Sequence, residues 1–196
     1  MIKKNILFIM IVATAFPSCI SLVNYQTGKT LSKQVTEITF STEVFPLDES
    51  SDDLTSVAFS PGISVYHGIS DKIDIGIRWE GLLAGSIGAK IQLLGNQSSK
   101  FAFALDPRFG GILLADNKFS SYTVVPGIFS FHPNEKFAIM AAEEFLLVPQ
   151  DDAHSSFSHS LGVEYGNDKT KVVLGATSNY YGLGFFQYGA GLKVRF

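Results

Sequence analysis

The chain ends with Gln187-Tyr-Gly-Ala-Gly-Leu-Lys-Val-Arg-Phe196, and this stretch decides the fold. In an extended strand, successive side chains point to opposite faces. One face of this strand carries Tyr188, Ala190, Leu192, Val194 and Phe196, and the other carries Gln187, Gly189, Gly191, Lys193 and Arg195. Chain termini usually fray and carry little pattern. Strict alternation up to a final aromatic residue therefore indicates a strand that belongs to the fold up to its last residue.

The same alternation runs through the chain from residue 34 to the end, in segments of about ten residues separated by turn formers. This pattern predicts an all-β fold, a transmembrane antiparallel up-and-down β-barrel, as one domain over 34–196. The ten expected strands lie near residues 34–45, 55–67, 74–80, 87–93, 101–109, 121–132, 136–147, 156–166, 170–178 and 185–196. Eight strands remain an alternative if the short fourth or ninth segment pairs differently.

The first residues have the pattern of a secretory signal, which we place at 1–18. Lys3 and Lys4 precede an apolar run from Ile6 to Val12, and small residues follow it. A membrane-spanning helix needs roughly 20 apolar residues, and this run meets Pro17 too soon. No later run approaches that length, so any membrane-spanning structure in the mature chain must be a closed β-barrel.

Cys19 is the only cysteine and follows the signal directly. The stretch Phe16-Pro-Ser-Cys19 resembles the lipobox of bacterial lipoproteins, although that pattern has leucine where Phe16 stands and a small residue where Pro17 stands. The resemblance implies acylation of Cys19, which would become the mature N-terminus. Cleavage after Ala15, which would leave a free thiol, is the alternative. Residues 19–33 read as a polar lead-in or tether to the barrel.

The side chains opposite the apolar face decide whether that face points outward or inward. They are mostly Gly, Ala and Ser with isolated charges of both signs, and charged residues make up only 17% of the chain. A soluble barrel of lipocalin type would instead carry a densely charged, solvated exterior. We therefore expect the apolar face to contact lipid and the charges to pair inside the lumen. The expected lumen network comprises Asp74, Arg78, Glu80, Lys90, Asp106, Arg108, Glu164, Lys193 and Arg195.

Aromatic residues near strand ends fit the girdles that mark membrane interfaces in such barrels. The expected girdle residues are Phe45, Trp79, Tyr122, Tyr165 and Tyr188.

The last strand also resembles the C-terminal strand of Gram-negative outer-membrane β-barrels, the superfamily of small porin-like and OmpA-type barrels. In those proteins a final Phe and alternating apolar residues form the signal read by the barrel-assembly machinery. Tyr188, Leu192, Val194 and Phe196 occupy the corresponding positions. The resemblance implies location in the outer membrane of a Gram-negative bacterium, with outer-membrane lipid and the assembly machinery as partners.

Three features fit the barrel pattern poorly. Pro61, Pro107 and Pro126 fall inside expected strands, where each removes a ladder hydrogen bond and suggests a bulge or bend. Phe129 and Phe131 fall on the expected inner face, so a slip of register at a bulge is expected there. The run 136–147 has good helix propensity, but context outweighs propensity and we expect a strand.

Chemical motifs are scarce. A net charge of −3 offers no basic surface for nucleic acid. The four histidines are not spaced as a metal cage and no cysteine pair exists, so we expect no metal and no cofactor. His154 and Ser156 are similar to the His-x-Ser motif of outer-membrane lipid A deacylases, in which an acidic residue on a neighbouring strand completes a triad. Glu144 or Glu143 could supply that acid.

The sequence therefore favours a small outer-membrane lipoprotein barrel with a non-catalytic surface, structural or adhesion role, and passage of very small solutes is compatible with it. One alternative is a lipid-anchored periplasmic lipocalin-like barrel that binds an apolar ligand. The other is a lipid A-modifying hydrolase. No pattern identifies a specific ligand.

Overall fold

A computed structural model describes the chain except for residues 1–22, 47–56, 82–83, 114–118, 150–153 and 180–185. The predicted signal at 1–18 and Cys19 therefore lie outside the described residues. The strands are β1 (Thr36–Pro46), β2 (Val57–Ser70), β3 (Ile73–Glu80), β4 (Ala84–Leu94), β5 (Phe101–Leu105), β6 (Arg108–Leu113), β7 (Phe119–Asn134), β8 (Phe137–Val148), β9 (His154–Gly166), β10 (Thr170–Asn179) and β11 (Phe186–Arg195).

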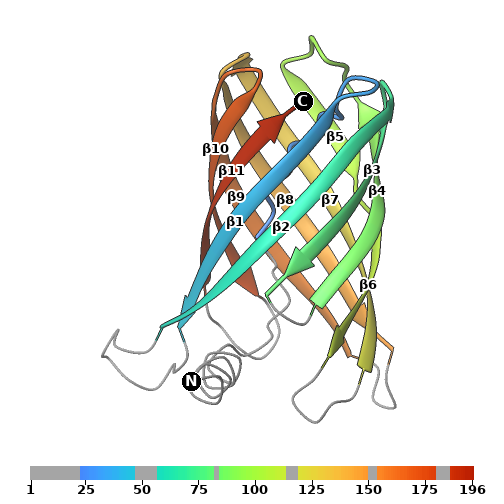
Figure 1. Cartoon of the computed structure of the whole chain (residues 1–196), viewed down its shortest axis with the longest axis vertical. Helices are drawn as coiled ribbons and strands as arrows, with labels where there is room; N and C mark the ends of the chain where they lie inside the picture. The colour runs from blue at the N-terminus through green and yellow to red at the C-terminus, as the bar shows by residue number, and fades with distance from the viewer. Residues whose placement is uncertain (1–22, 47–56, 82–83, 114–118, 150–153, 180–185) are drawn as a thin grey trace, which may run out of the picture.

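The strands close into one antiparallel barrel of up-and-down topology (Figure 1). Strands that follow one another in the sequence pair with each other, apart from β5 and β6, and β1 pairs with β11 to complete the ring. β5 and β6 both lie between β4 and β7 and share one position in the ring, so the eleven elements make ten strands. The predicted ten-stranded barrel is confirmed, and the run 136–147 is strand β8 rather than a helix.

The two ends of the barrel differ in their connections. At one end, which we call the turn end, residues 71–72, 95–100, 135–136 and 167–169 join successive strands. The C-terminus also lies there (Figure 1), where Phe196 and Thr36 exchange backbone hydrogen bonds of 3.0 and 3.2 Å. The opposite end, which we call the loop end, carries the connections over 47–56, 81–83, 114–118, 149–153 and 180–185.

Large apolar side chains cover the outside of the barrel. Ile77, Ile87 and Leu161 are 58%, 63% and 67% exposed, whereas Asp74, Lys90 and Lys193 inside are at most 1% exposed. This surface is the reverse of a soluble barrel and suits contact with hydrocarbon. The lipocalin-like alternative, with an apolar interior, is therefore wrong. Within the described residues, no helix is long and apolar enough to cross a membrane.

The register slip expected in β7 is present, but it follows the two phenylalanines and lies between Phe131 and Asn134 in the pairing with β8. The pairing is regular from Thr123 to Phe131, and Phe129 points outward with 55% exposure, so its expected place on the inner face is wrong. The alternation misleads here because the inner face of β7 carries several apolar side chains. Tyr122 and Val124 pack there against Ala84 and Ile112.

This packing corrects one expected girdle residue, because Tyr122 is buried in the lumen. Trp79, Tyr165 and Tyr188 do lie on the exterior, each more than half exposed, and the side chain of Phe45 lies outside the described part of the structure.

The three prolines behave differently from one another. Pro107 lies between β5 and β6 and interrupts the strand there, as a residue without a backbone donor is expected to do. Pro61 and Pro126 instead lie within β2 and β7, whose registers with β1 and β8 run through them without a shift. The expected bulge or bend occurs only at Pro107.

Candidate functional site: the lumen and the segment inside it

Residues 23–35, which we call the lumenal segment, run through the inside of the barrel as far as Leu31 and then cross the turn end, where 32–34 are exposed, before β1 begins. Val23, Tyr25, Gln26 and Leu31 are all at most 4% exposed. The carbonyl oxygen of Val23 accepts a hydrogen bond of 3.0 Å from Nη2 of Arg78, which lies two residues before the loop end of β3. Farther along, Thr30 Oγ1 donates to the carbonyl of Asp71 at the turn end (2.7 Å). The segment thus runs from the loop side of the lumen to the turn end.

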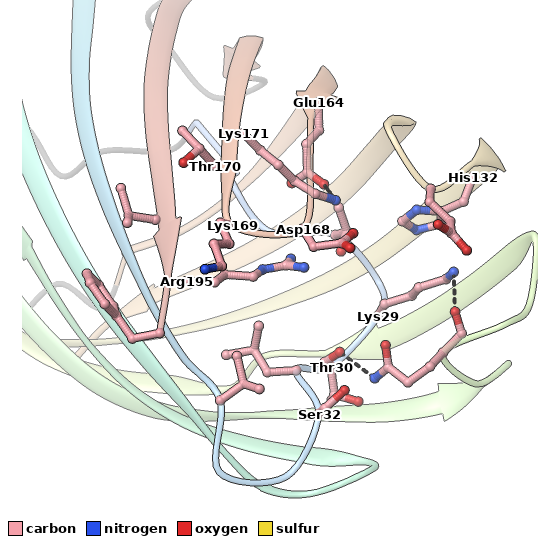
Figure 2. Close-up of a pocket in the computed structure, with 17 residues that line it drawn as sticks. Lys29, Thr30, Ser32, His132, Glu164, Asp168, Lys169, Thr170, Lys171 and Arg195 are labelled. Atoms are coloured by element: carbon pink, nitrogen blue, oxygen red, sulfur yellow. Dashed lines mark hydrogen bonds and ion pairs between the residues drawn. The ribbon is translucent and has the colours of Figure 1, made fainter.

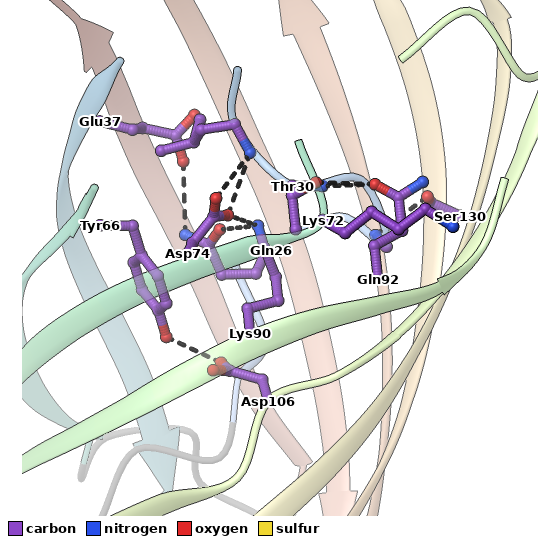
Figure 3. A network of polar contacts seen from close by, with 12 residues as sticks. Gln26, Thr30, Glu37, Tyr66, Lys72, Asp74, Lys90, Gln92, Asp106 and Ser130 are labelled. Atoms are coloured by element: carbon purple, nitrogen blue, oxygen red, sulfur yellow. Dashed lines mark hydrogen bonds and ion pairs between the residues drawn. The ribbon is translucent and has the colours of Figure 1, made fainter. Parts of the chain in front are cut away.

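Charged side chains of the wall hold the middle of the lumenal segment (Figure 3). Gln26 Oε1 accepts a hydrogen bond of 3.1 Å from Lys90 Nζ, and Gln26 Nε2 donates to Glu37 (3.4 Å). The backbone N–H of Leu31 donates to both carboxylate oxygens of Asp74, at 3.0 Å each. Hydrogen bonds with one ionised partner are the stronger class, so these contacts fix the segment in place.

The backbone of the lumenal segment also touches the wall closely. The N–H of Gly28 donates to Ser130 Oγ (3.0 Å), and a Cβ at Gly28 would lie only 2.7 Å from the carbonyl oxygen of Ala102. Only glycine fits at this approach. Thr30 is held similarly, because its N–H donates to Gln92 Oε1 at 3.0 Å and its Oγ1 lies 2.8 Å from the same oxygen.

Small residues on the inner face of β11 make room for the segment. A Cβ at Gly189 would lie 2.1 Å from the hydroxyl of Tyr25, and one at Gly191 would lie 3.2 Å from its ring. The guanidinium of Arg78 lies over the same ring, 5.7 Å from its centroid. The glycines that alternate along the C-terminal strand therefore form the notch that receives Tyr25.

Ion pairs fill the turn-side half of the lumen. Glu164 accepts hydrogen bonds from Lys171 (2.6 Å) and Lys193 (2.7 Å), and all three side chains are at least nine-tenths buried. Glu37 pairs with Arg195 at 2.7 Å, and Asp74 pairs with Lys90 at 3.1 Å. These are hydrogen-bonded pairs in which each carboxylate has a nearby cation.

The loop-side half of the lumen is organised around two arginines. Arg78 Nε lies 2.5 Å from Glu80, whereas Arg108 has looser contacts of 3.6 to 3.9 Å with Asp106, Glu80 and Glu144. Neither carboxylate oxygen of Glu144 has a hydrogen-bond partner among the described residues. Four carboxylates, counting Glu43, meet two guanidinium groups here, so this half carries an excess of negative formal charge.

A cavity of about 850 Å³ opens at the turn end above the lumenal segment (Figure 2). Ionisable side chains line it together with the C-terminal residue, and they include Lys29, His132, Glu164, Asp168, Lys169, Lys171 and Arg195. Partial burial, with the nearby charge of Lys171, lowers the pKa of Lys29 below its ordinary value. A hydrogen bond of 2.7 Å from Lys29 Nζ to the carbonyl of Gln97 offsets part of this cost. The cavity is the mouth of a lumen that the segment occupies.

A polar pair interrupts the apolar exterior between β8 and β9. Glu143 on β8 and His159 on β9 are register partners and their side chains are in hydrogen-bond contact, with 63% and 47% of each exposed. Ser178 on β10 is the register partner of His159 on its other side. A carboxylate that orients an imidazole, with a serine on the next strand, is an arrangement that nucleophilic catalysis also uses.

The structure places the predicted site residues as follows. The nine residues of the expected charge network all point into the lumen, with Arg195 nearest to the mouth. At the C-terminal strand, Tyr188, Leu192 and Phe196 are exposed on the exterior, and Val194 is half-buried on the same face.

The residues predicted for a hydrolytic triad, His154, Ser156 and Glu144, are not register partners of one another in β8 and β9. Glu144 is the register partner of Ser158, Ser156 is the partner of Leu146, and His154 is the first residue of β9, with a side chain outside the described part. Glu144 instead faces Arg108 in the lumen. The acidic residue and histidine whose side chains do contact each other are Glu143 and His159. They lie 16 residues apart, so no short sequence motif indicates the contact.

Sequence reasoning missed the role of the lumenal segment. Residues 24–30, Asn-Tyr-Gln-Thr-Gly-Lys-Thr, show no alternation, so the sequence predicts only a tether there. The available signal was steric: side chains fill the interior of an eight-stranded barrel, and a ten-stranded one lined by Gly and Ser leaves space that must be filled.

Two further observations complete the description. Among the residues that the structure describes, no group of three or more His, Cys, Asp or Glu side chains could hold a metal ion. On the exterior, Gly85 and Gly111 lie between the rings of Trp79 and Phe119 and leave an apolar recess of about 630 Å³.

Comparison with known proteins gives likeness of fold only. No protein-family model matches the chain, and no curated protein matches it. The NanC porin structure has a TM-score of 0.49 at 10% identity over 82% of this chain and 98% of that one. The N-terminal β-barrel domain of Pseudomonas aeruginosa OprF has a TM-score of 0.40 at 13% identity, over 85% and 100%. Ail, the attachment invasion locus protein of Yersinia pestis, has a TM-score of 0.37 at 11% identity, over 85% and 100%.

Proposed function

We propose that this protein is an integral outer-membrane barrel whose lumen is closed by its own N-terminal segment. Its role is then structural or adhesive, carried by the surface it exposes, rather than catalytic or conductive. The single observation that carries the proposal is the hydrogen-bonded lumenal segment inside a barrel with an apolar exterior.

The exterior and the two ends support the location and orientation. Closed barrels with apolar flanks are the β-structures that membranes accept, and bacterial ones have short turns on the periplasmic side and longer loops outside. The turn end, where β1 begins and β11 ends, then faces the periplasm. The recess beside Gly85 and Gly111 has the size and apolarity to hold an acyl chain of the surrounding lipid.

Partnership with the barrel-assembly machinery is part of the proposal. The exposed face of β11 offers the alternating apolar residues that the C-terminal signal requires, and Phe196 is 73% exposed at its end. If Cys19 is acylated, the protein also belongs to the outer-membrane lipoproteins.

Conductance in planar bilayers tests closure of the lumen. The full chain is compared with a variant that lacks residues 20–31, after both have been shown to run as folded barrels on unheated gels. We expect no current steps from the full chain and clear steps from the deletion variant, because the lumen wall is polar and the filling segment is gone. Equal conductance of the two proteins would contradict closure, and would favour passage of small solutes through the native barrel.

A second candidate function is hydrolysis of a lipid ester, favoured only by the exterior pair of Glu143 and His159. Ser178 would attack the ester carbonyl while His159 accepts its proton and passes it to the departing alcohol as the ester C–O bond breaks. Water, deprotonated by His159, would then hydrolyse the acyl-serine and release the fatty acid. The acylation of lipid A and of phospholipids would be compared between cells that express the native chain and cells that express Ser178→Ala. Ser156→Ala, on the inward-facing side of β9, serves as the control. Unchanged acylation with the native chain excludes this function.

A further inference from the structure

We infer that the exterior recess beside Gly85 and Gly111 is a binding site for one acyl chain of a membrane lipid, in the leaflet that surrounds the loop end. The inference deepens the proposed function and rests on it, because it requires an exterior that contacts hydrocarbon. A chain held in the recess would stay with the barrel, whereas the lipids around the rest of the exterior exchange freely.

The floor of the recess is a pair of glycines on adjacent strands. Gly85 on β4 is the register partner of Gly111 on β6, so neither strand places a side chain there. The rings of Trp79 on β3 and Phe119 on β7 line the recess on either side, and both are more than half exposed. The result is a two-strand-wide dip in the apolar exterior between two aromatic walls.

Glycine at position 85 is not required by its protein neighbours. At Gly111, a Cβ would lie only 2.1 Å from Cζ of Phe119, so that ring occupies the space of the missing side chain. At Gly85, a Cβ would make only ordinary contacts, at 3.5 Å from the ring of Trp79 and from the carbonyl oxygen of Arg78. The register of β4 with β3 and β6 also runs through Gly85 without a shift. Glycine in a strand without a bulge often marks a close approach by a ligand, and the open space here faces the membrane.

An acyl chain is the occupant that suits this space. The volume of about 630 Å³ lies within the usual range of small-molecule sites, about 300–1,000 Å³. Water is a poor occupant, because a trapped water needs several polar partners and exposed apolar side chains form the walls. Lipid tails are as apolar as the side chains, so retention depends on dispersion contacts rather than on a hydrophobic gain. A chain in the recess contacts protein on several sides, whereas a chain on the convex exterior contacts it on one.

The recess lies close to the loop end of the barrel. Trp79 is the second-last residue of β3, and Phe119 is the first residue of β7. The next exterior register pair toward the turn end, Ile87 and Phe109, carries large exposed side chains instead of glycines. Aromatic residues at strand ends mark the membrane interface, so the recess would receive the part of an acyl chain nearest to its head group.

Trp79 is the only tryptophan of the chain, so its fluorescence reports directly on the recess. The probe is a stearoyl phosphatidylcholine with a nitroxide quencher on the upper part of one chain, titrated into the folded full-length barrel in detergent micelles. Gly85→Leu fills the recess, and Phe119→Ala removes one wall as a second variant. Gly127→Leu is the matched control, because a Cβ there makes an ordinary contact of 3.5 Å with the ring of Phe103, away from the recess. Folding of every variant is verified on unheated gels.

We expect quenching of the native chain and of Gly127→Leu to saturate at a low fraction of probe in the micelle. The saturable part should be lost in Gly85→Leu and in Phe119→Ala. Quenching of the native chain that only rises in proportion to the probe, or that still saturates in Gly85→Leu, overturns the site. A native dimer that becomes a monomer in Gly85→Leu would show that a second copy of the chain fills the recess, and it overturns the site as well.

A water-soluble quencher separates this failure from failure of the proposed function. In lipid vesicles, acrylamide should quench Trp79 of the folded barrel far less than Trp79 of the unfolded chain. Equal quenching would mean that the exterior does not contact lipid, and the proposed function then fails together with the site. Weak quenching by acrylamide without saturation by the nitroxide lipid leaves the barrel in the membrane and overturns the acyl-chain site alone.

Discussion

At the scale of single residues, the exterior pair of Glu143 and His159 is the clearest exception to the pattern of the barrel. The two side chains contact each other between Phe145 and Phe157 on one side and Leu161 on the other. A charged group that faces hydrocarbon is costly unless a partner shares its charge or hydrogen bonds. The pair is therefore expected to behave as one unit.

A double-mutant cycle tests this coupling. His159→Leu leaves a carboxylate without its partner and should destabilise the barrel more than Glu143→Leu/His159→Leu does. We expect a coupling of about 1 kcal/mol or more, within the range measured for contacting residues. The measurement is the urea midpoint in lipid vesicles. Additive single effects would show that the contact contributes nothing to stability.

Inside the lumen, Glu164 is expected to contribute strongly to the stability of the barrel, because it pairs with both Lys171 and Lys193. Glu164→Gln keeps the shape but leaves two buried ammonium groups without their shared carboxylate. Removal of one partner from a buried ion pair costs about 3–5 kcal/mol. We expect a large drop in the urea midpoint, with Glu135→Gln in the exposed turn before β8 as the control for loss of a carboxylate. Equal effects of the two changes would contradict the central role of Glu164.

At the scale of strands, the sequence sufficed for most of the fold because alternation records which face meets lipid. β3 and β4 are clear cases, in which isoleucines alternate with Gly, Ser and charged residues. Prediction failed on the inner face of β7, where Tyr122 and Val124 pack against the wall of the lumen rather than against lipid. A period of two cannot distinguish a buried apolar contact from a lipid contact.

The lipid-facing side of β3 supports a direct test. Ile77 is 58% exposed in the centre of the strand, and Ile77→Arg would place a charge in hydrocarbon. The expected cost is about 2–4 kcal/mol at the middle of the bilayer and less near the interfaces. Ile77→Leu is the matched control and should leave stability nearly unchanged. Tolerance of the arginine, measured by folding yield and urea midpoint in vesicles, would mean that this face does not contact lipid.

At the scale of the whole molecule, the charges of the lumen could be predicted, but their arrangement around a lumenal segment could not. The charged residues are visible in each strand, whereas the occupation of the lumen depends on barrel radius and on the sum of many small inward side chains such as Gly189 and Gly191. The exterior pair of Glu143 and His159 was likewise hidden, because the register that aligns β8 with β9 is a property of the closed sheet.

The lumenal segment should therefore behave as a separable part of the core. A synthetic peptide of residues 22–35, added to the variant that lacks 20–31, should restore closure in planar bilayers, because its contacts with Arg78, Lys90 and Asp74 do not need a covalent link. Covalent attachment gives an effective concentration of about millimolar, so the peptide must be supplied near that level to compete.

The peptide experiment has a matched control in Gly28→Val, whose side chain would collide with the carbonyl of Ala102. The native peptide should block the current in a concentration-dependent manner and the Gly28→Val peptide should not. Since both peptides carry the same charge, equal block would mean that charge alone attracts the peptide to the lumen. Closure of the barrel would then depend on electrostatic attraction rather than on the fitted contacts that the structure contains.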